Sequence, residues 1–173
     1  MERFYPTDEQ VKKLVADAIS ILETRDRKLF EKNANERSFS ARLLHYLELQ
    51  IEVRKWDEHW VVDCEYNRML SRDGWDEAKT IDVLKKRHPE ECEQTVEDTE
   101  ARTVFPDIVV HARGTEHNLL VVELKKRRLG SNDAAVQYDR DVKLRSYLDQ
   151  LGYRYAMFIR IDTDGCKCYC ESI

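Results

Sequence analysis

Glycine and proline are scarce: the chain of 173 residues holds five of the first and three of the second. This scarcity excludes the Gly- and Pro-rich low-complexity classes. Hydrophobic residues make up 42% of the chain and charged residues 36%, which indicates a folded domain with a heavily charged surface. Because this length buries one sizeable core, whereas two cores would leave each half small, we expect a single domain over residues 1–173.

Long apolar runs are also absent. No stretch of the sequence approaches the roughly 20 apolar residues that cross a bilayer. Residues 1–6 lack the apolar run of a secretory signal. We therefore expect a soluble cytoplasmic protein with no membrane partner.

The five cysteines include no CxxC pair, and their number is odd, so we expect free thiols rather than a disulfide framework. Cys166, Cys168 and Cys170 alternate, which predicts one common face of a strand. A metal or iron–sulfur centre with Cys64 as fourth ligand is one interpretation. Buried structural cysteines are the favoured one, because same-face strand positions lie about 6.7 Å apart along a rigid axis.

The net charge of −5 argues against nonspecific coating of nucleic acid, which draws on clustered Lys and Arg. The charges are distributed unevenly. Residues 73–101 hold ten acidic and four basic side chains, whereas residues 123–147 hold seven basic and four acidic ones. We expect a polyanion to approach the second segment; the alternative is two solvated faces of opposite sign.

The N-terminal third predicts two helices. Thr7 and Gln10 form a capping box, and apolar residues then follow helical spacing to about Thr24. A charged connector is expected over residues 25–35. The second helix is expected over residues 36–49, where the apolar stripe has helical spacing.

The middle of the chain predicts strands and one helix. Residues 60–67 read as a strand, residues 75–87 as a helix and the acidic residues 90–103 as a loop. Residues 105–112 and 118–125 are rich in β-branched and aliphatic side chains and predict a hairpin. Because both of its strands are largely apolar, helices are expected on both faces.

The C-terminal part predicts a helix and two strands. Ser131 begins a helix that ends at Gly152, a strand follows over residues 153–161, and a turn leads to the last strand over residues 166–173. This order predicts an α/β fold with a central mixed sheet flanked by helices.

Three charged residues occupy the ends of the predicted hairpin. Asp107 begins the first strand, and Glu123 and Lys125 end the second on one face, so antiparallel pairing brings them to the same edge. Charges at the end of so apolar a run are costly to bury unless they are paired or bind a metal. Two carboxylates with nearby water suit Mg²⁺, and Lys125 can orient water or stabilise charge in the transition state.

The sequence Pro106-Asp107, followed by Glu123-Leu124-Lys125, resembles the PD-(D/E)xK nuclease superfamily. The resemblance implies a restriction endonuclease-like αβββαβ core over roughly residues 36–161, and it leaves residues 1–35 as an N-terminal helical extension to a core of about 36–173. It further implies a divalent-metal phosphodiesterase that uses Mg²⁺ or Mn²⁺ on DNA, less often RNA. In the family a first-helix acid supports the site, and Glu36 stands in that position.

Each assigned role has a structural alternative. Asp107 is also an ordinary strand-start residue after proline, and Glu123 and Lys125 also form a plausible surface ion pair. Glu36 either points at the site or compensates the helix dipole. Asp63 and Glu65 are either extra ligands or part of a solvated strand face.

Basic residues follow the motif and are assigned to nucleic-acid binding. Lys126, Arg127 and Arg128 extend the basic edge, and Lys143 lies four residues before Tyr147 on one helical face. Some families of the superfamily place Gln and Tyr at that spacing beside the metal. Lys143 has two interpretations: it contacts a phosphate, or it belongs to a solvated helix face.

Two hypotheses follow. The first is a nuclease with Asp107 and Glu123 as metal ligands, Lys125 as the catalytic cation and Glu36 as support. The second is a noncatalytic module of the same fold that binds nucleic acid or a protein partner. The small size predicts a homodimer on a duplex substrate. The histidines lack ligand spacing and receive no role.

Overall fold

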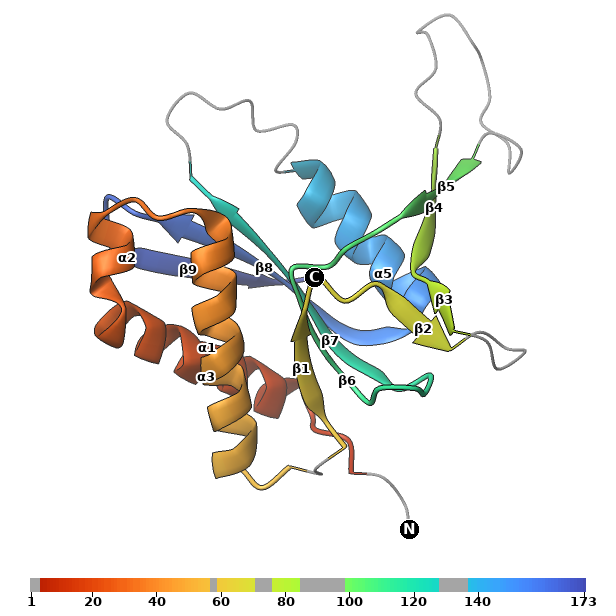
Figure 1. The fold of residues 1–173 in the computed structure, drawn as a ribbon, viewed down its shortest axis with the longest axis horizontal. Helices are drawn as coiled ribbons and strands as arrows, with labels where there is room; N and C mark the ends of the chain where they lie inside the picture. The colour runs from red at the N-terminus through yellow and green to blue at the C-terminus, as the bar shows by residue number, and fades with distance from the viewer. Residues whose placement is uncertain (1–3, 57–58, 71–75, 85–98, 128–136) are drawn as a thin grey trace, which may run out of the picture.

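The computed structural model describes residues 4–56, 59–70, 76–84, 99–127 and 137–173 (Figure 1). Its helices and strands are, in chain order, α1 (Asp8–Arg25), α2 (Arg27–Glu31), α3 (Glu36–Val53), β1 (Val61–Cys64), β2 (Arg68–Leu70), β3 (Asp76–Ala78), β4 (Thr80–Leu84), β5 (Thr99–Thr103), β6 (Ile108–His111), β7 (Asn118–Lys126), the π-helix η2 (Tyr138–Lys143), α5 (Leu144–Leu151), β8 (Tyr153–Asp162) and β9 (Lys167–Ser172).

The main sheet has five strands in the order β1-β6-β7-β8-β9. Only β7 and β8 are parallel; the other neighbours are antiparallel. Figure 1 shows α1 and α3 on one side of this sheet and α5 on the other, and each side has its own hydrophobic core. The predicted α/β architecture, a mixed sheet flanked by helices, is confirmed.

The predicted N-terminal helices are present. The Thr7 side chain accepts from the Gln10 N–H and the Gln10 side chain accepts from the Thr7 N–H, so the capping box is confirmed. Asn35 caps α3 by accepting from Ser38. The predicted connector over residues 25–35 is wrong in part, because α2 lies within it around the buried Phe30, and α3 continues beyond residue 49 to Val53.

The structure corrects two predictions, because residues 76–84 and 99–103 contain strands. The predicted helix over residues 75–87 is wrong where the structure describes it, because β3 pairs with β2 and β4 pairs with β5. The predicted loop over residues 90–103 ends in β5, and its earlier part lies outside the described residues. Figure 1 shows these two small sheets on the side of α5, where the buried Ile81 of β4 joins the second core.

The predicted hairpin of β6 and β7 is confirmed, and both of its faces are covered. Ile108 and Val122 pack with α1 and α3, whereas Val109 and Val121 pack beneath α5. Its turn places Gly114 at a φ of 67°, a conformation that glycine adopts without steric cost.

The segment between β7 and β8 is the crossover that a parallel pair requires. Its described part is helical from residue 137, as π-helix and then α-helix, and it stops at Gly152 with a φ of 67°, as predicted. The predicted cap at Ser131 lies outside the described residues. No helix in the described ranges is long and apolar enough to cross a bilayer.

Cys64 lies on the edge strand β1, whereas Cys168 and Cys170 lie on the opposite edge strand β9, so the shared metal centre is excluded. The four described cysteines are free thiols, as expected. Cys166 precedes β9 and packs with Cys168 against the first core. Cys64 and Cys170 are exposed, so the prediction of buried cysteines is wrong for these two, and Cys166 and Cys168 are only partly buried.

Candidate functional site

The candidate site lies at the end of the main sheet, where β6 begins and β7 ends. The register pairs Ile108 with Val122, and continuing it by one residue sets Asp107 opposite Glu123. Because side chains alternate along a strand, Lys125 shares the face of Glu123. This is the face that α5 covers. The fold thus brings the two acids and the amine to one place.

Asp107 is partly buried beside Glu123. Its Oδ2 accepts a hydrogen bond of 2.7 Å from the backbone N–H of Leu124. Burial raises the pKa of Asp107 and is the largest influence on it. The bond from Leu124, the charges of Lys125 and Lys143 and the contact with the Glu123 side chain lower the same pKa by less. The carboxyl groups of Asp107 and Glu123 thus lie close together.

Glu123 is only 1% exposed and is held by the crossover helix. Lys143 Nζ lies 2.7 Å from Glu123 Oε1, and the Tyr147 hydroxyl donates to the same oxygen at 3.1 Å. Burial, with the adjacent charge of Glu123, raises the pKa of Tyr147, which keeps this hydroxyl a donor. The interpretation of Lys143 as part of a solvated face is wrong, because its side chain is 19% exposed and paired with Glu123.

Lys143 occupies the last position of the π-helix, directly before α5. Short π-helical segments occur frequently at functional sites. The same spacing of four that predicted a common face places Lys143 and Tyr147 on one carboxylate oxygen. A phosphate contact by Lys143 stays a prediction.

Glu36 and Lys126 join the start of α3 to the end of β7. Glu36 Oε1 accepts from the Lys126 N–H at 3.0 Å. In return, Lys126 Nζ donates to the carbonyls of Asn33 and Ala34 at 3.1 and 2.9 Å. Lys126 thus satisfies carbonyl groups at the turn before α3, and its assigned contact with nucleic acid stays a prediction.

A pocket of about 360 Å³ opens between the start of α3 and the ends of β1 and β6. Its lining residues are Glu36, Arg37, Ser40, Ala41, Cys64, Glu65 and Asp107. Glu36 and Asp107 therefore border one space, although the backbone of β7 already uses one oxygen of each. Glu65 follows β1 at a φ of 49° and pairs with Arg37 at 3.2 Å.

Arg127, also assigned to nucleic acid, pairs with an acid other than Asp107 and Glu123, the acid pair of the candidate site. Arg127 lies just beyond β7, and its largely exposed guanidinium donates to Asp162 Oδ2 at 3.4 Å. Arg128 lies outside the described residues. The assignment of Arg127 and Arg128 stays a prediction.

The acid pair fits a magnesium ion better than a metal held by protein alone. Within the described ranges, no group of three or more His, Cys, Asp or Glu side chains gathers as a ligand set. Mg²⁺ needs only one or two carboxylates, with waters and substrate phosphates as the other ligands. Asp107 and Glu123 supply that number, and a bound metal would compete with protons for the two carboxylates.

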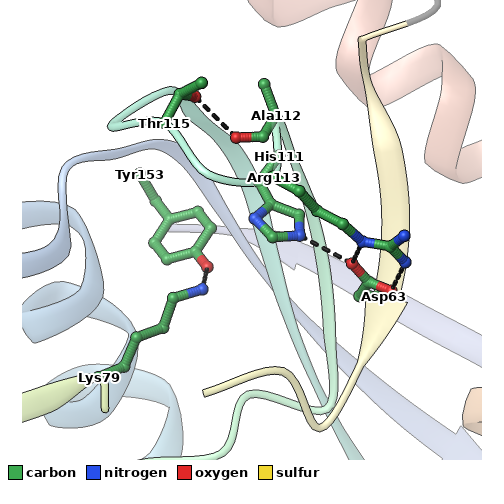
Figure 2. A network of polar contacts seen from close by, with 7 residues as sticks. All are labelled: Asp63, Lys79, His111, Ala112, Arg113, Thr115 and Tyr153. Carbon is green, nitrogen blue, oxygen red and sulfur yellow. Dashed lines mark hydrogen bonds and ion pairs between the residues drawn. The ribbon is translucent and has the colours of Figure 1, made fainter. Parts of the chain in front are cut away.

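A second polar network lies on the same face of the sheet, further along β1 and β6 (Figure 2). His111 Nε2 and Asp63 Oδ2 are 2.8 Å apart, and Arg113 forms two bonds to the same carboxylate, one of them 2.7 Å long. Burial opposes the charge of Asp63, but the bonds from Arg113 and His111 outweigh it and lower the pKa of Asp63. Asp63 is thus a network anion, neither a metal ligand of this site nor part of a solvated face.

Lys79 is the buried cation beside this network. It is 1% exposed, and its Nζ donates to the Tyr153 hydroxyl at 2.5 Å (Figure 2). The ammonium also lies 5.1 Å from the centroid of the Tyr66 ring. Aromatic faces stabilise a desolvated cation. Burial nevertheless lowers the pKa of Lys79 to about 8, against an opposing effect of Asp63.

Lys79 is expected to make stability depend on pH. Because its pKa falls from 10.5 to about 8 on folding, the unfolded chain holds a proton between these values that the folded chain has lost. Stability therefore rises with pH across this window, and Lys79 should add about 2 kcal/mol between pH 7 and pH 9.5. Urea unfolding of the wild type and of Lys79→Met at both pH values tests this. Methionine does not titrate, so an equal change in the two proteins would contradict the prediction.

Sequence reasoning missed the second network. His111 received no role because the histidines lack ligand spacing in the sequence. A signal was available in Asp63, because strand β1 is otherwise apolar on both sides of it and its charge needed a partner. The partners themselves come from β6 and its turn, 48 and 50 residues later.

The comparisons with known proteins found no match: no protein-family profile, no curated protein and no solved structure is significantly similar to this chain.

Proposed function

We propose that this chain is a divalent-metal-dependent nuclease with a restriction endonuclease-like core formed by α3, β1, β6, β7, the crossover helix and β8. One observation carries the proposal: Asp107 lies opposite Glu123, with Lys125 on the same face, at the end of a sheet covered by helices. Such a buried concentration of charge is costly unless it serves a function.

Asp107 and Glu123 would hold Mg²⁺ or Mn²⁺. When bound, the metal would polarise the phosphodiester and lower the pKa of a water molecule. The backbone N–H of Leu124 orients Asp107, and Tyr147 orients Glu123. Lys125 lies two residues beyond Glu123 and supplies positive charge beside the phosphate.

Glu36 has a supporting role in this proposal. Its carboxylate fixes the backbone of β7 one residue after Lys125 while lining the pocket that Asp107 also borders. The substrate is proposed to be DNA. Cleavage of both strands of a duplex would use a homodimer, because the described part of one chain supplies one such site.

The proposal is tested by cleavage of linear, circular and branched DNA with and without Mg²⁺ or Mn²⁺. The wild type should cleave only with metal, and Lys125→Ala should lose roughly 10²-fold in rate. Lys12→Ala is the matched control, because Lys12 lies on α1 in an exposed pair with Asp8. Equal rates for the wild type and Lys125→Ala would end the catalytic proposal.

A second candidate is a noncatalytic nucleic-acid-binding module in which Lys143 permanently neutralises the acid pair. The contact of 2.7 Å between Lys143 and Glu123 favours it, because an ammonium already occupies a side of the site that a metal would use.

Replacing Lys143 with methionine separates the two candidates. The variant should bind Mn²⁺ about tenfold more tightly than the wild type, because a positive charge beside Glu123 opposes a second cation. Isothermal calorimetry without nucleic acid measures this, with Lys12→Met as the control. Mn²⁺ binding by the variant alone would favour the noncatalytic module, and unchanged affinity would show that Lys143 does not compete.

A further inference from the structure

Three side chains form a row across the main sheet beside the acid pair. The register sets Lys125 of β7 next to Arg160 of β8, and Arg160 next to Tyr169 of β9. Paired residues of neighbouring strands project from the same face, so the row lies on the face of Glu123. With strands about 4.8 Å apart, it extends roughly 10 Å from the candidate site toward the edge of the sheet.

The crossover helix covers the first two residues of the adjacent row and approaches the third, which is exposed. This row consists of Glu123, Phe158 and Glu171. Lys143 pairs with Glu123, and Arg140 approaches Glu171 at 3.4 Å, so the π-helix spans this row from end to end.

The row of Lys125, Arg160 and Tyr169 begins where this cover ends. Arg160 is exposed and Tyr169 is 46% exposed, although both are large side chains on a strand. The guanidinium of Arg160 lies 5.2 Å from the centroid of the Tyr169 ring. In the described part of the chain, no carboxylate forms an ion pair with Arg160.

This combination fits an unpaired nucleic-acid strand. Proteins hold single strands with cations that follow the phosphates and with aromatic rings on which bases stack. A base in a duplex has both faces covered by its neighbours, whereas an unpaired base can stack on Tyr169. The alternative is a purely structural cross-strand pair of Arg160 and Tyr169, which is a common arrangement. That alternative does not explain why the row begins beside Asp107 and Glu123.

We propose that Lys125, Arg160 and Tyr169 bind a single-stranded segment of nucleic acid, with phosphates on the two cations and a base on the tyrosine ring. This inference rests on the proposed nuclease function for the identity of its ligand. It narrows the substrate to nucleic acid that is unpaired next to the scissile phosphate, such as a flap, an overhang or a free strand.

Fluorescence anisotropy in EDTA tests the site without hydrolysis. The probes are a labelled 12-nucleotide DNA strand, the RNA of the same sequence and the matching DNA duplex. Tyr169→Ala should weaken binding of the single strand about tenfold and leave the duplex unchanged, whereas Tyr169→Phe, which keeps the ring, should stay within about twofold of the wild type. Tighter binding of RNA than of DNA would identify RNA as the source of the strand.

Arg160→Ala should lower the slope of log affinity against log salt by about 0.7, the loss of one phosphate contact on a single strand. Arg154→Ala is the matched control, because Arg154 lies on the same strand, at its opposite end, over the ring of Tyr5. Urea unfolding of each variant shows whether the fold is retained, and the conservative Tyr169→Phe variant keeps the test valid if Tyr169→Ala is unstable.

The outcomes separate this inference from the proposed function. Single-strand binding that is absent in the wild type, or unchanged in Tyr169→Ala and Arg160→Ala, overturns the inference, even if the protein cleaves duplex DNA with metal. Binding that depends on Tyr169, in a protein that cleaves nothing with metal, supports the strand site and ends the nuclease proposal.

Discussion

Replacing Asp107 with asparagine is expected to reduce metal-dependent cleavage by about 10³-fold. The substitution removes a charged ligand while keeping an oxygen that can accept from the Leu124 N–H. Loss of about 4 kcal/mol of metal-mediated stabilisation in the transition state corresponds to this factor. Initial rates on a DNA substrate at saturating Mn²⁺ measure it.

The same variant should not lose stability. Because burial raises the pKa of Asp107, its ionised form is disfavoured in the folded protein, and a neutral amide removes that cost. Asp149→Asn is the matched control, since Asp149 is exposed on α5. Full activity of Asp107→Asn would exclude Asp107 as a ligand, and a large loss of stability would make the activity result uninformative about ligation.

Replacing Asp63 with alanine is expected to lower the free energy of unfolding by about 3 kcal/mol. Its carboxylate is the acceptor for both His111 and Arg113, and hydrogen bonds to a charged group contribute roughly 1.5–3 kcal/mol each. The side chain of Arg113 is 58% exposed and regains water, so most of the loss comes from the buried His111.

Urea denaturation at pH 7 measures this loss, with Asp8→Ala as the control. Asp8 also pairs with a cation, Lys12, but both side chains are about half exposed, so its loss should cost only about 0.5 kcal/mol. Similar losses of unfolding free energy in the two variants would contradict the prediction that burial makes the Asp63 network more stabilising than an exposed ion pair.

Elements defined by neighbouring residues were predictable from the sequence. The capping box of α1 needs only Thr7 and Gln10, and the β6–β7 hairpin needs one turn between two apolar runs. β4 was not predicted, because its partner β5 follows only after residues 85–98. Its own residues carried a strand signal, since Thr80 to Val83 alternate between polar and apolar side chains, but so short a segment does not reveal its distant partner.

The site was predictable to the same extent. Asp107, Glu123 and Lys125 could be placed together because one hairpin sets their positions. Spacing put Lys143 and Tyr147 on one face, but their contact with Glu123 depends on how the crossover packs on the sheet. No local pattern encodes that packing. The row of Lys125, Arg160 and Tyr169 likewise depends on a parallel register between β7 and β8 that only the folded sheet defines.

The parallel pairing of β7 with β8 also constrains the order in which the protein folds. Antiparallel neighbours such as β6 and β7 can meet through a short turn, but β8 reaches β7 only after residues 127–152 have closed a long loop. The entropy cost of closing this loop must be met before the contacts between β7 and β8 can offset it. We therefore expect the hairpin with Asp107 and Glu123 to form early. The ammonium of Lys143 would then arrive late, and a nascent or partly unfolded chain would expose two unneutralised acids to solvent cations.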